Sequence, residues 1–504
     1  MTEVKSTSNS ETEVKSTSKT SKNLVLFVYL LLLAVIGPAL FWFLNQKPQT
    51  SLKADNPAPK ESTSSIASNP TDGDAIQKRF SIGTQVLVTE DNQPEKQAAV
   101  QAYEKGDYST AVTKFSSVLQ TNRNDPEALI YLNNAKAALK GQLIKIGTSV
   151  PIGGNLNVAR EILRGVAQAQ NEINNTGGID GKLLQVEIAN DNNDPAIAKR
   201  VAAAFVKDPS IIAVIGHNSS EASIAAAPIY QEGGLVMISP TSVARNLSGI
   251  GSHIFRTTPN SKAMANALAT YVIKTARKTK VAVCSASKTE ASQSFQEEFT
   301  TAIFEDGGKV VNIPCDFSDP NFNASDVPAK AISAGAEALV LAPSLNSINQ
   351  SIDVLQAAKR KLTVFGSQTM YAIETLKQGQ SDANGMVLAV PWHPALATGS
   401  PFAANAKKLW GGSGNWRTAM SYDAALAMSS GLKSGATREQ LQQALSNSGF
   451  SAKGATGAVQ FLPSGDRLMK VVLVKVQPGK ESGTGYDFTA LKPTANPSPA
   501  EPAL

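Results

Sequence analysis

Residues 165–198 read GVAQAQNEINNTGGIDGKLLQVEIANDNNDPAIA. A helical spacing of apolar residues ends at Thr176-Gly-Gly, where glycine permits a positive φ, and Asp180-Gly forms a second turn. The β-rich run LLQVEIA follows these turns, and another helical pattern comes after it. A short apolar strand between two helices is typical of a βαβ unit, so this stretch predicts a parallel sheet that is covered on both faces.

The same alternation continues on both sides of this stretch. We predict further strands at IKIGTSV, IIAVIGH and LVMISP, and a helix over about 159–176. A second series begins at Lys280 with KVAVC and continues with KVVNIPC, ALVLAP and LTVFGS, separated by helices near 294–306 and 329–335. The sequence therefore predicts the α/β class, with two Rossmann-like, doubly wound lobes.

The quoted stretch and three later motifs, VIGHNSS, VMISPTS and FRTTPN, resemble the leucine/isoleucine/valine-binding branch of type I periplasmic binding proteins. The resemblance covers about Leu143 to Val476. It implies a binding domain at 142–479 with lobe one at about 142–260 and 394–454, lobe two at about 261–393 and 455–479, and a hinge of several crossovers. It also implies capture of a small molecule between the lobes, with no chemistry on it, for an ABC-type permease.

Two serines mark a candidate ligand site in lobe one. Gly216 ends a predicted strand, and Ser219 and Ser220 begin the next helix, which places hydroxyls and free N–H groups at the carboxyl edge of the sheet. Such a helix start favours a carboxylate or amide oxygen, although serine also commonly just caps its own helix. The resemblance implies that this turn holds the ligand's carboxylate and that Thr241 and Ser242 add contacts.

The sequence departs from the family pattern in lobe two. Where branched-chain receptors carry a tyrosine, this chain has Ala291, and the place of their acid for the ligand's ammonium is occupied by Gln368, which is uncharged. A buried ammonium without a charged partner loses about 2 to 5 kcal/mol. We therefore expect an amino-acid-like or amide-like ligand (an amino acid, an amide, a urea or a small peptide), with amides, ureas and small peptides favoured over branched-chain amino acids. Glu290 could replace the missing acid, or be an ordinary surface glutamate.

The N-terminal region predicts a membrane anchor. Residues 24–45 are uncharged up to Asn45 and long enough to cross a bilayer as one helix; a cleavable signal is the alternative. Lysines before the span place residues 1–23 in the cytoplasm. The expected location is the bacterial cytoplasmic membrane, single-pass, with the binding domain in the periplasm or outside. The polar residues 46–94 predict a flexible linker, and 480–504 a disordered tail.

Residues 95–141 have helical spacing and resemble one tetratricopeptide repeat plus the first helix of a second. The resemblance is carried by Gly106, Tyr108, Ala111, Phe115, Leu119 and Pro126. Such repeats need about three copies to be stable alone, so the segment is either a spacer packed on its neighbour or a protein-docking site. The docking interpretation supports a second hypothesis, in which the lobes belong to a ligand-sensing or scaffold receptor without transport.

Composition argues against other classes of function. The net charge of +6 is spread thinly, without basic runs interleaved with aromatics, so we expect no nucleic-acid partner. The three histidines lack metal-ligand spacing, and no motif of a nucleophile, a phosphate loop or a dinucleotide site is present. We therefore predict no enzyme, no metal and no cofactor. Cys284 and Cys315 each close a predicted strand and form either one disulfide or two small buried core residues.

Overall fold

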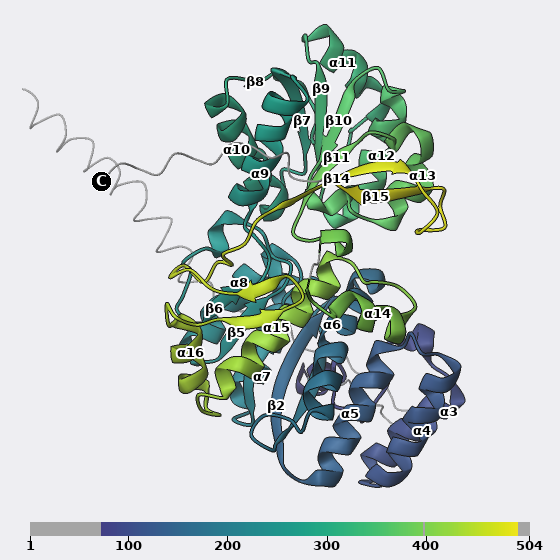
Figure 1. Ribbon diagram of the computed structural model, residues 1–504, viewed down its shortest axis with the longest axis vertical. Coiled ribbons are helices and arrows are strands. Elements are labelled where there is room, and N and C mark those ends of the chain that lie inside the picture. The colour runs from purple at the N-terminus through teal and green to yellow at the C-terminus, as the bar shows by residue number, and fades with distance from the viewer. Residues whose placement is uncertain (1–71, 397–398, 492–504) are drawn as a thin grey trace, which may run out of the picture. The chain divides into compact units, whose positions relative to one another are not determined.

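The computed structural model describes residues 72–396 and 399–491, which contain two lobes, each built around one sheet (Figure 1). The predicted cytoplasmic tail, 1–23, and the predicted membrane anchor, 24–45, lie outside the described residues. Within the described part of the chain, no helix has the length and apolar character needed to cross a bilayer.

Lobe one contains a six-stranded sheet with the order β1-β3-β2-β4-β5-β6. Its last five members are parallel, and only β1 is antiparallel, at the edge. β2 lies between β3 and β4, which is the doubly wound arrangement that the sequence predicted. The strands are β1 (Phe80–Ser81), β2 (Leu143–Val150), β3 (Leu183–Asn190), β4 (Ile211–Ile215), β5 (Val236–Ser239) and β6 (Ile254–Arg256).

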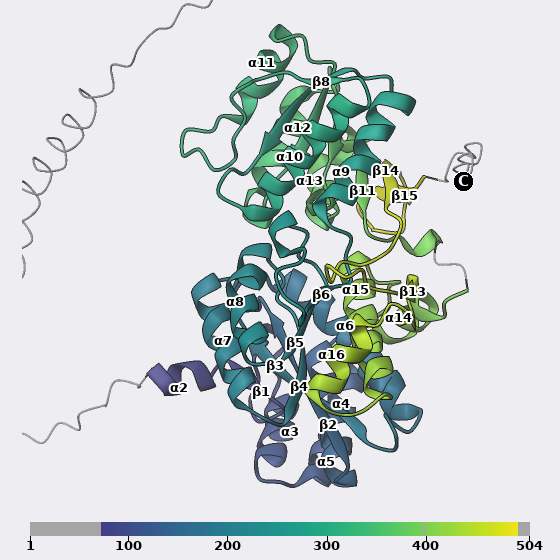
Figure 2. The same cartoon turned by 90° about the vertical axis from the view of Figure 1, so that its left-hand side faces the viewer.

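Helices cover both faces of this sheet, as the apolar strands require. Figure 2 shows α7 and α8 on one side and α15 and α16 on the other. Two separate cores result, one with Phe205 under α7 and α8 and one with Ile146 under α6 and α15. The helices of lobe one are α6 (Leu156–Asn175), α7 (Pro195–Lys207), α8 (Ser220–Glu232), α14 (Phe402–Trp410), α15 (Trp416–Leu432) and α16 (Arg438–Ser446).

Lobe two repeats the plan with a seven-stranded sheet of order β15-β14-β11-β10-β9-β7-β8. Its strands are β7 (Lys280–Ser285), β8 (Lys309–Val310), β9 (Ala338–Ala342), β10 (Thr363–Gly366), β11 (Val387–Val390), β14 (Val472–Pro478) and β15 (Tyr486–Ala490). Its helices are α9 (Ser261–Thr270), α10 (Glu290–Glu305), α11 (Val327–Ser333), α12 (Ile348–Ala358) and α13 (Ile373–Ala383). The predicted strand KVVNIPC is shorter than expected, because only its first two residues pair as β8.

Cys284 and Cys315 form a disulfide in lobe two, which settles the two alternatives that the sequence left open. Cys284 lies in β7, and Cys315 follows β8, in the core that α11, α12 and α13 cover. The bridge therefore fastens the irregular segment after β8 to the sheet.

The chain passes between the lobes three times: from β6 to α9, from β11 to α14, and from the small hairpin β12 (Ala452–Gly454) and β13 (Gly457–Val459) to β14. The third passage was predicted near Ala455, and this is wrong. Residues up to Met469 pack on lobe one, and the buried Arg256 of β6 is paired with Asp466 through Nε at 2.6 Å. Residues 455–469 therefore belong to lobe one.

The segment predicted as tetratricopeptide-like forms three helices, α3 (Pro94–Glu104), α4 (Tyr108–Thr121) and α5 (Pro126–Lys140). Its apolar residues share one core with lobe one. Lys96 is fully buried and pairs with Asp125 at 2.7 Å and Glu127 at 2.8 Å, which joins the start of α3 to the start of α5. The helices are thus an integral part of lobe one.

Two regions predicted to lack structure are ordered. The linker prediction, 46–94, is wrong for its described part, which forms α2 (Asp72–Gln77), β1 and the short helix η1 (Thr89–Asp91). The tail prediction, 480–504, is wrong over β15, which pairs with β14. In both places, an edge of a sheet offers backbone hydrogen-bond partners to a polar segment. The other short helices are η2 (Arg245–Leu247), η3 (Tyr271–Thr275), η4 (Ala324–Asp326), η5 (Leu345–Ser347), η6 (Gln368–Met370) and η7 (Pro394–Leu396).

Candidate ligand-binding cavity

The start of α8 forms one wall of a cavity at the carboxyl edge of the lobe-one sheet. Ser219 is the N-cap residue, and its Oγ accepts a hydrogen bond from the N–H of Ala222 at 3.1 Å. In the described structure, the N–H groups of Ser220 and Glu221 have no acceptor, as expected for the first turn of a helix. Ser219 therefore caps the helix and also lines the cavity, and the free donors make this wall attractive to an anion.

The loop after β5 lies beside this turn and separates the two predicted contact residues. Thr241 lines the cavity, and its hydroxyl donates to the carbonyl oxygen of Asn218 at 2.8 Å, which leaves its lone pairs to accept from a ligand. Ser242 is 1% exposed, does not line the cavity, and exchanges a hydrogen bond with Ser223 at 2.7 Å between Oγ atoms. Ser242 thus holds the loop against α8 instead of facing the cavity.

Lobe two closes the cavity with the ends of its own strands and with the start of α10. Ala291 lies in the first turn of α10, and Gln368 and Thr369 follow β10. Gln368 is 5% exposed, and its Oε1 has no hydrogen-bond partner in the described structure. A buried acceptor without a partner is costly, so this oxygen is available to an N–H or O–H group of a ligand.

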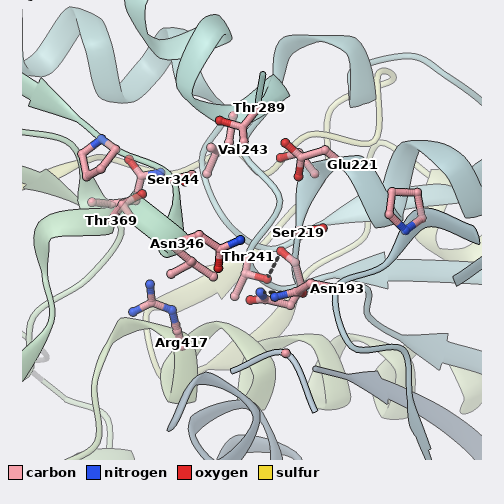
Figure 3. A pocket seen from close by; sticks show the side chains of 18 of the residues that line it. Asn193, Ser219, Glu221, Thr241, Val243, Thr289, Ser344, Asn346, Thr369 and Arg417 are labelled. Atoms are coloured by element: carbon pink, nitrogen blue, oxygen red, sulfur yellow. Dashed lines mark hydrogen bonds between the residues drawn. The ribbon is translucent and has the colours of Figure 1, made fainter. Parts of the chain in front are cut away.

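The cavity between the lobes has a volume of about 330 Å³ (Figure 3). Both lobes contribute polar side chains to it, and five of the six predicted residues line it, all except Ser242. The predicted residues are Ser219, Ser220, Thr241, Ala291 and Gln368; the further polar lining comes from Asn192, Asn193, Asn218, Glu221, Thr289, Ser344, Asn346, Thr369 and Arg417.

Trp416 and Arg417 also line the cavity and were not predicted from the sequence. They are the first two residues of α15, and Asn415 caps that helix through hydrogen bonds to the N–H groups of its first turn. The Arg417 guanidinium lies over the Trp416 ring, 4.3 Å from its centroid. These residues come long after the other lining residues in the chain, so only the second passage between the lobes brings them to the site.

A buried polar cluster supports the loops that line lobe one. Asp191 is fully buried and accepts hydrogen bonds from His217 Nδ1 at 2.6 Å and from the Ser149 hydroxyl at 2.8 Å. Burial alone would raise the pKa of Asp191, but its hydrogen bonds and its electrostatic interaction with His217 hold it below its ordinary value. Gly216 precedes His217 at φ 140°, where a Cβ would lie 2.6 Å from the Ser149 carbonyl oxygen, so only glycine fits.

The lobes touch at the rim of the cavity. The Glu221 carboxylate accepts a hydrogen bond from the N–H of Glu290 at 2.7 Å, and the Glu290 carboxylate accepts one from Asn246 at 2.9 Å. Glu290 does not line the cavity, so it does not replace the missing acid; its carboxylate contacts lobe one at the rim instead. The cavity is therefore bounded by two lobes that are in contact.

Comparison with known proteins places the chain in a family. The sequence pattern described as periplasmic binding protein matches residues 143–481. This range is more than half of the chain, so the protein belongs to the periplasmic binding protein family. Members of this family bind solutes, in agreement with the prediction that the chain is not an enzyme.

Individual relatives match over shorter stretches. A Leu/Ile/Val-binding protein of Escherichia coli (strain K12) is 33% identical over 156 residues, which is 31% of this chain and 41% of that protein. An amino acid binding protein of Pseudomonas aeruginosa is 32% identical over 142 residues, 28% of this chain and 38% of that protein. These matches thus span less than half of the relatives' lengths.

Solved structures share the fold of both lobes. A leucine binding protein from Thermotoga maritima superposes with a TM-score of 0.61 at 20% identity, over 70% of this chain and 99% of that chain. A substrate-binding protein from Desulfitobacterium hafniense in complex with Leu gives 0.59 at 22% identity, over 69% of this chain and 100% of that chain. At such identities the likeness establishes the fold alone.

Proposed function

We propose that this protein is an extracytoplasmic solute-binding protein that captures a small amino-acid-like or amide-like molecule between its lobes for an ABC-type transporter. The observation that carries the proposal is the cavity of about 330 Å³, to which both lobes contribute polar groups without partners. Its volume suits a molecule the size of an amino acid. The names of the relatives, amino acid and Leu/Ile/Val-binding proteins, support the same function.

Capture proceeds by closure of the lobes. The ligand docks first on lobe one, where Ser219 and the free N–H groups of α8 donate to it and Thr241 accepts from it. Lobe two then rotates and adds Gln368 and Thr369. The closed state is favoured only as far as the ligand binds it more tightly than the open state.

The proposal includes a membrane anchor. Residues 24–45 would hold the protein in the bacterial cytoplasmic membrane as a single span, and the binding domain would face the periplasm or the outside. The alternative, a sensing or scaffold receptor that uses the tetratricopeptide-like helices for docking, has less support, because their apolar residues are buried in the core of lobe one. We assign those helices a supporting role in lobe one.

Ligand-induced stabilisation tests the proposed function. The full-length protein in detergent is screened by thermal unfolding against amino acids, amides, urea, organic acids and small peptides. A ligand at 100 times its Kd is expected to add about 2.7 kcal/mol to the free energy of unfolding. No shift with any member of a broad panel would contradict solute capture.

A cavity-filling variant locates the binding. Ala291→Leu adds a side chain inside the cavity without disturbing α10, since leucine is a good helix former. We expect it to abolish the ligand-induced shift. Ala329→Leu is the matched control, because Ala329 is exposed on α11 of the same lobe and away from the cavity. Equal loss in both variants would place binding elsewhere.

A further inference from the structure

Arg417 is a buried cation in the wall of the cavity. It is 6% exposed, and Figure 3 shows its side chain rising from α15 below Asn346 and Thr369 of lobe two. Arg417 is the single basic residue among those that line this cavity. A bound molecule therefore meets one cation, Arg417, and one acid, Glu221, in this cavity.

The guanidinium of Arg417 has no ionic partner in residues 72–396 and 399–491. None of its nitrogens makes a hydrogen bond there, and no carboxylate lies within 4.0 Å of it. The acids that act on it from a distance are Glu161 and Glu374. Glu161 is already bonded to Arg164 and to the Thr418 hydroxyl. The stacking on Trp416 compensates only part of the lost hydration.

Arg417 nevertheless carries its charge at neutral pH. Burial lowers its pKa to about 10, with Glu161 and Glu374 opposing this shift, and that value still lies well above 7. Leaving a charge buried and unpaired is unfavourable. A ligand that brings a carboxylate removes this penalty on binding, and guanidinium forms two parallel hydrogen bonds with a carboxylate.

The same cavity offers a single acid to an ammonium group. Its one acidic lining residue is Glu221, whose carboxylate accepts the N–H of Glu290 at the start of α10. The positive end of that helix stabilises the carboxylate and offsets part of its charge. What remains on the lobe-two side is the neutral Gln368 Oε1, which accepts an N–H or O–H without requiring a charge.

We propose that the cavity selects an organic acid without an ammonium group: a carboxylate that pairs with Arg417, and a neutral amide or hydroxyl donor for Gln368. Acylated or carbamoylated amino acids and hydroxy acids have this chemistry. The inference rests on the proposed function and narrows the class of ligand. It predicts that a free zwitterionic amino acid binds more weakly than its acylated form.

The decisive probes share the leucine side chain and differ in which of their two ends carries a charge. Leucine carries both charges, and N-acetylleucine carries only the negative one. Leucinamide carries only the positive charge, and N-acetylleucinamide carries none. Benzoate and benzamide form a second pair without an α-substituent. Binding to the full-length protein is followed by calorimetry and by Trp fluorescence, because Trp416 lies in the cavity.

We expect N-acetylleucine to bind at least about tenfold more tightly than leucine or N-acetylleucinamide, and benzoate to bind more tightly than benzamide. Tighter binding of leucine would overturn the inference and assign Glu221 as the partner of the ammonium group. Binding of the neutral amides alone would also overturn it, while leaving solute capture intact. If none of these probes and no member of the broader panel binds, the proposed function itself fails.

Variants assign the effect to Arg417. Arg417→Gln is expected to remove the preference for the carboxylate, and Arg417→Lys to retain part of it, since lysine keeps the charge but not the paired geometry. Arg164→Gln is the matched control. Arg164 and Arg417 both line a neighbouring cavity of about 740 Å³, but only Arg417 reaches the cavity proposed here. Equal effects of both substitutions would place the anion in the neighbouring cavity and overturn the inference.

Discussion

At the scale of single residues, buried polar groups that do not line the cavity hold its lining loops in place. Asp191 is buried directly before Asn192 and Asn193, which line the cavity, and its carboxylate is held by His217 and Ser149. The other ring nitrogen of His217, Nε2, is hydrogen-bonded to the Tyr230 hydroxyl at 3.1 Å. This cluster fixes the ends of three parallel strands, and its carboxylate makes the arrangement sensitive to acid.

Stability is expected to fall at low pH through Asp191. Its pKa in the folded state lies below the ordinary 3.8, so its contribution is present above about pH 4 and is lost as the pH falls through the folded-state value. Asp191→Asn should lower the free energy of unfolding at pH 7 by about 1 to 3 kcal/mol and reduce the acid-dependent slope.

Urea unfolding from pH 7 down to pH 3 measures both effects. Asp180→Asn serves as the control, since Asp180 is exposed in a turn at φ 50°, a conformation that asparagine also accepts. An unchanged slope in the Asp191 variant would show that other groups control the acid response.

At the scale of elements, one asparagine joins α5 to the edge of the lobe-one sheet. Asn134 Nδ2 donates to the carbonyl oxygens of Ile82 at 2.9 Å and Val186 at 2.7 Å, and Oδ1 accepts from the Val186 N–H at 2.9 Å. Gln170 of α6 donates to the same Oδ1 at 2.8 Å. The Asn134 side chain thus makes the backbone hydrogen bonds to Val186 of β3 that a neighbouring strand would otherwise make.

Asn134→Ala is expected to destabilise lobe one by at least about 2 kcal/mol, because it leaves several buried backbone groups unsatisfied. Hydrogen exchange should increase at the β3 amides, and chemical denaturation gives the free energy. Asn124→Ala is the control, since Asn124 is exposed and has one hydrogen bond to Arg164. A β3 that stays protected would contradict the role of α5 as part of the sheet's edge.

In lobe two, the disulfide between Cys284 and Cys315 joins a loop to the sheet, as Asn134 joins α5 to the sheet in lobe one. Its cysteines are 31 residues apart, and closing a loop of this length contributes about 3 to 4 kcal/mol in the chain-entropy model. Reduction, or replacement of Cys284 and Cys315 by alanine, should therefore lower the unfolding temperature of lobe two. No change after complete reduction would mean that packing alone fixes the segment after β8.

At the scale of the whole molecule, contacts at the rim favour the closed arrangement. Glu221 of lobe one caps α10 of lobe two, and the N–H of Arg245 donates to the Ser294 hydroxyl at 3.1 Å. Glu221→Gln keeps a neutral acceptor but removes the charge that favours the N-terminus of a helix. The structure therefore predicts a shift towards open lobes when this charge is lost.

In ligand-free Glu221→Gln protein, the shift is expected as a larger radius of gyration by small-angle scattering, together with a roughly fivefold weaker apparent Kd for the identified ligand. Glu232→Gln, at the exposed far end of α8, should change neither quantity. A weaker Kd at constant radius would mean that Glu221 contacts the ligand and does not control closure.

Much of this architecture follows from the sequence, because buried parallel strands leave continuous apolar runs and ligand groups gather where those strands end. Ser219 was found in this way, whereas Thr241 and Gln368 were predicted from the family resemblance. Arg417 was not predicted, because its place depends on how α15 returns to lobe one after a long excursion through lobe two. The pairing of β1 was also not predicted, since a strand of two residues is too short to show the alternation of apolar and polar residues that marks a strand.

The triple passage between the lobes has a consequence for cutting and exchanging them. A single protease cut in any one passage leaves two covalent connections, so the nicked protein should stay in one piece under native conditions and separate only on a denaturing gel. Exchange of a whole lobe by recombination needs three breakpoints instead of one. The two halves of the cavity are therefore expected to be inherited together, and to change their ligand by substitution and not by shuffling.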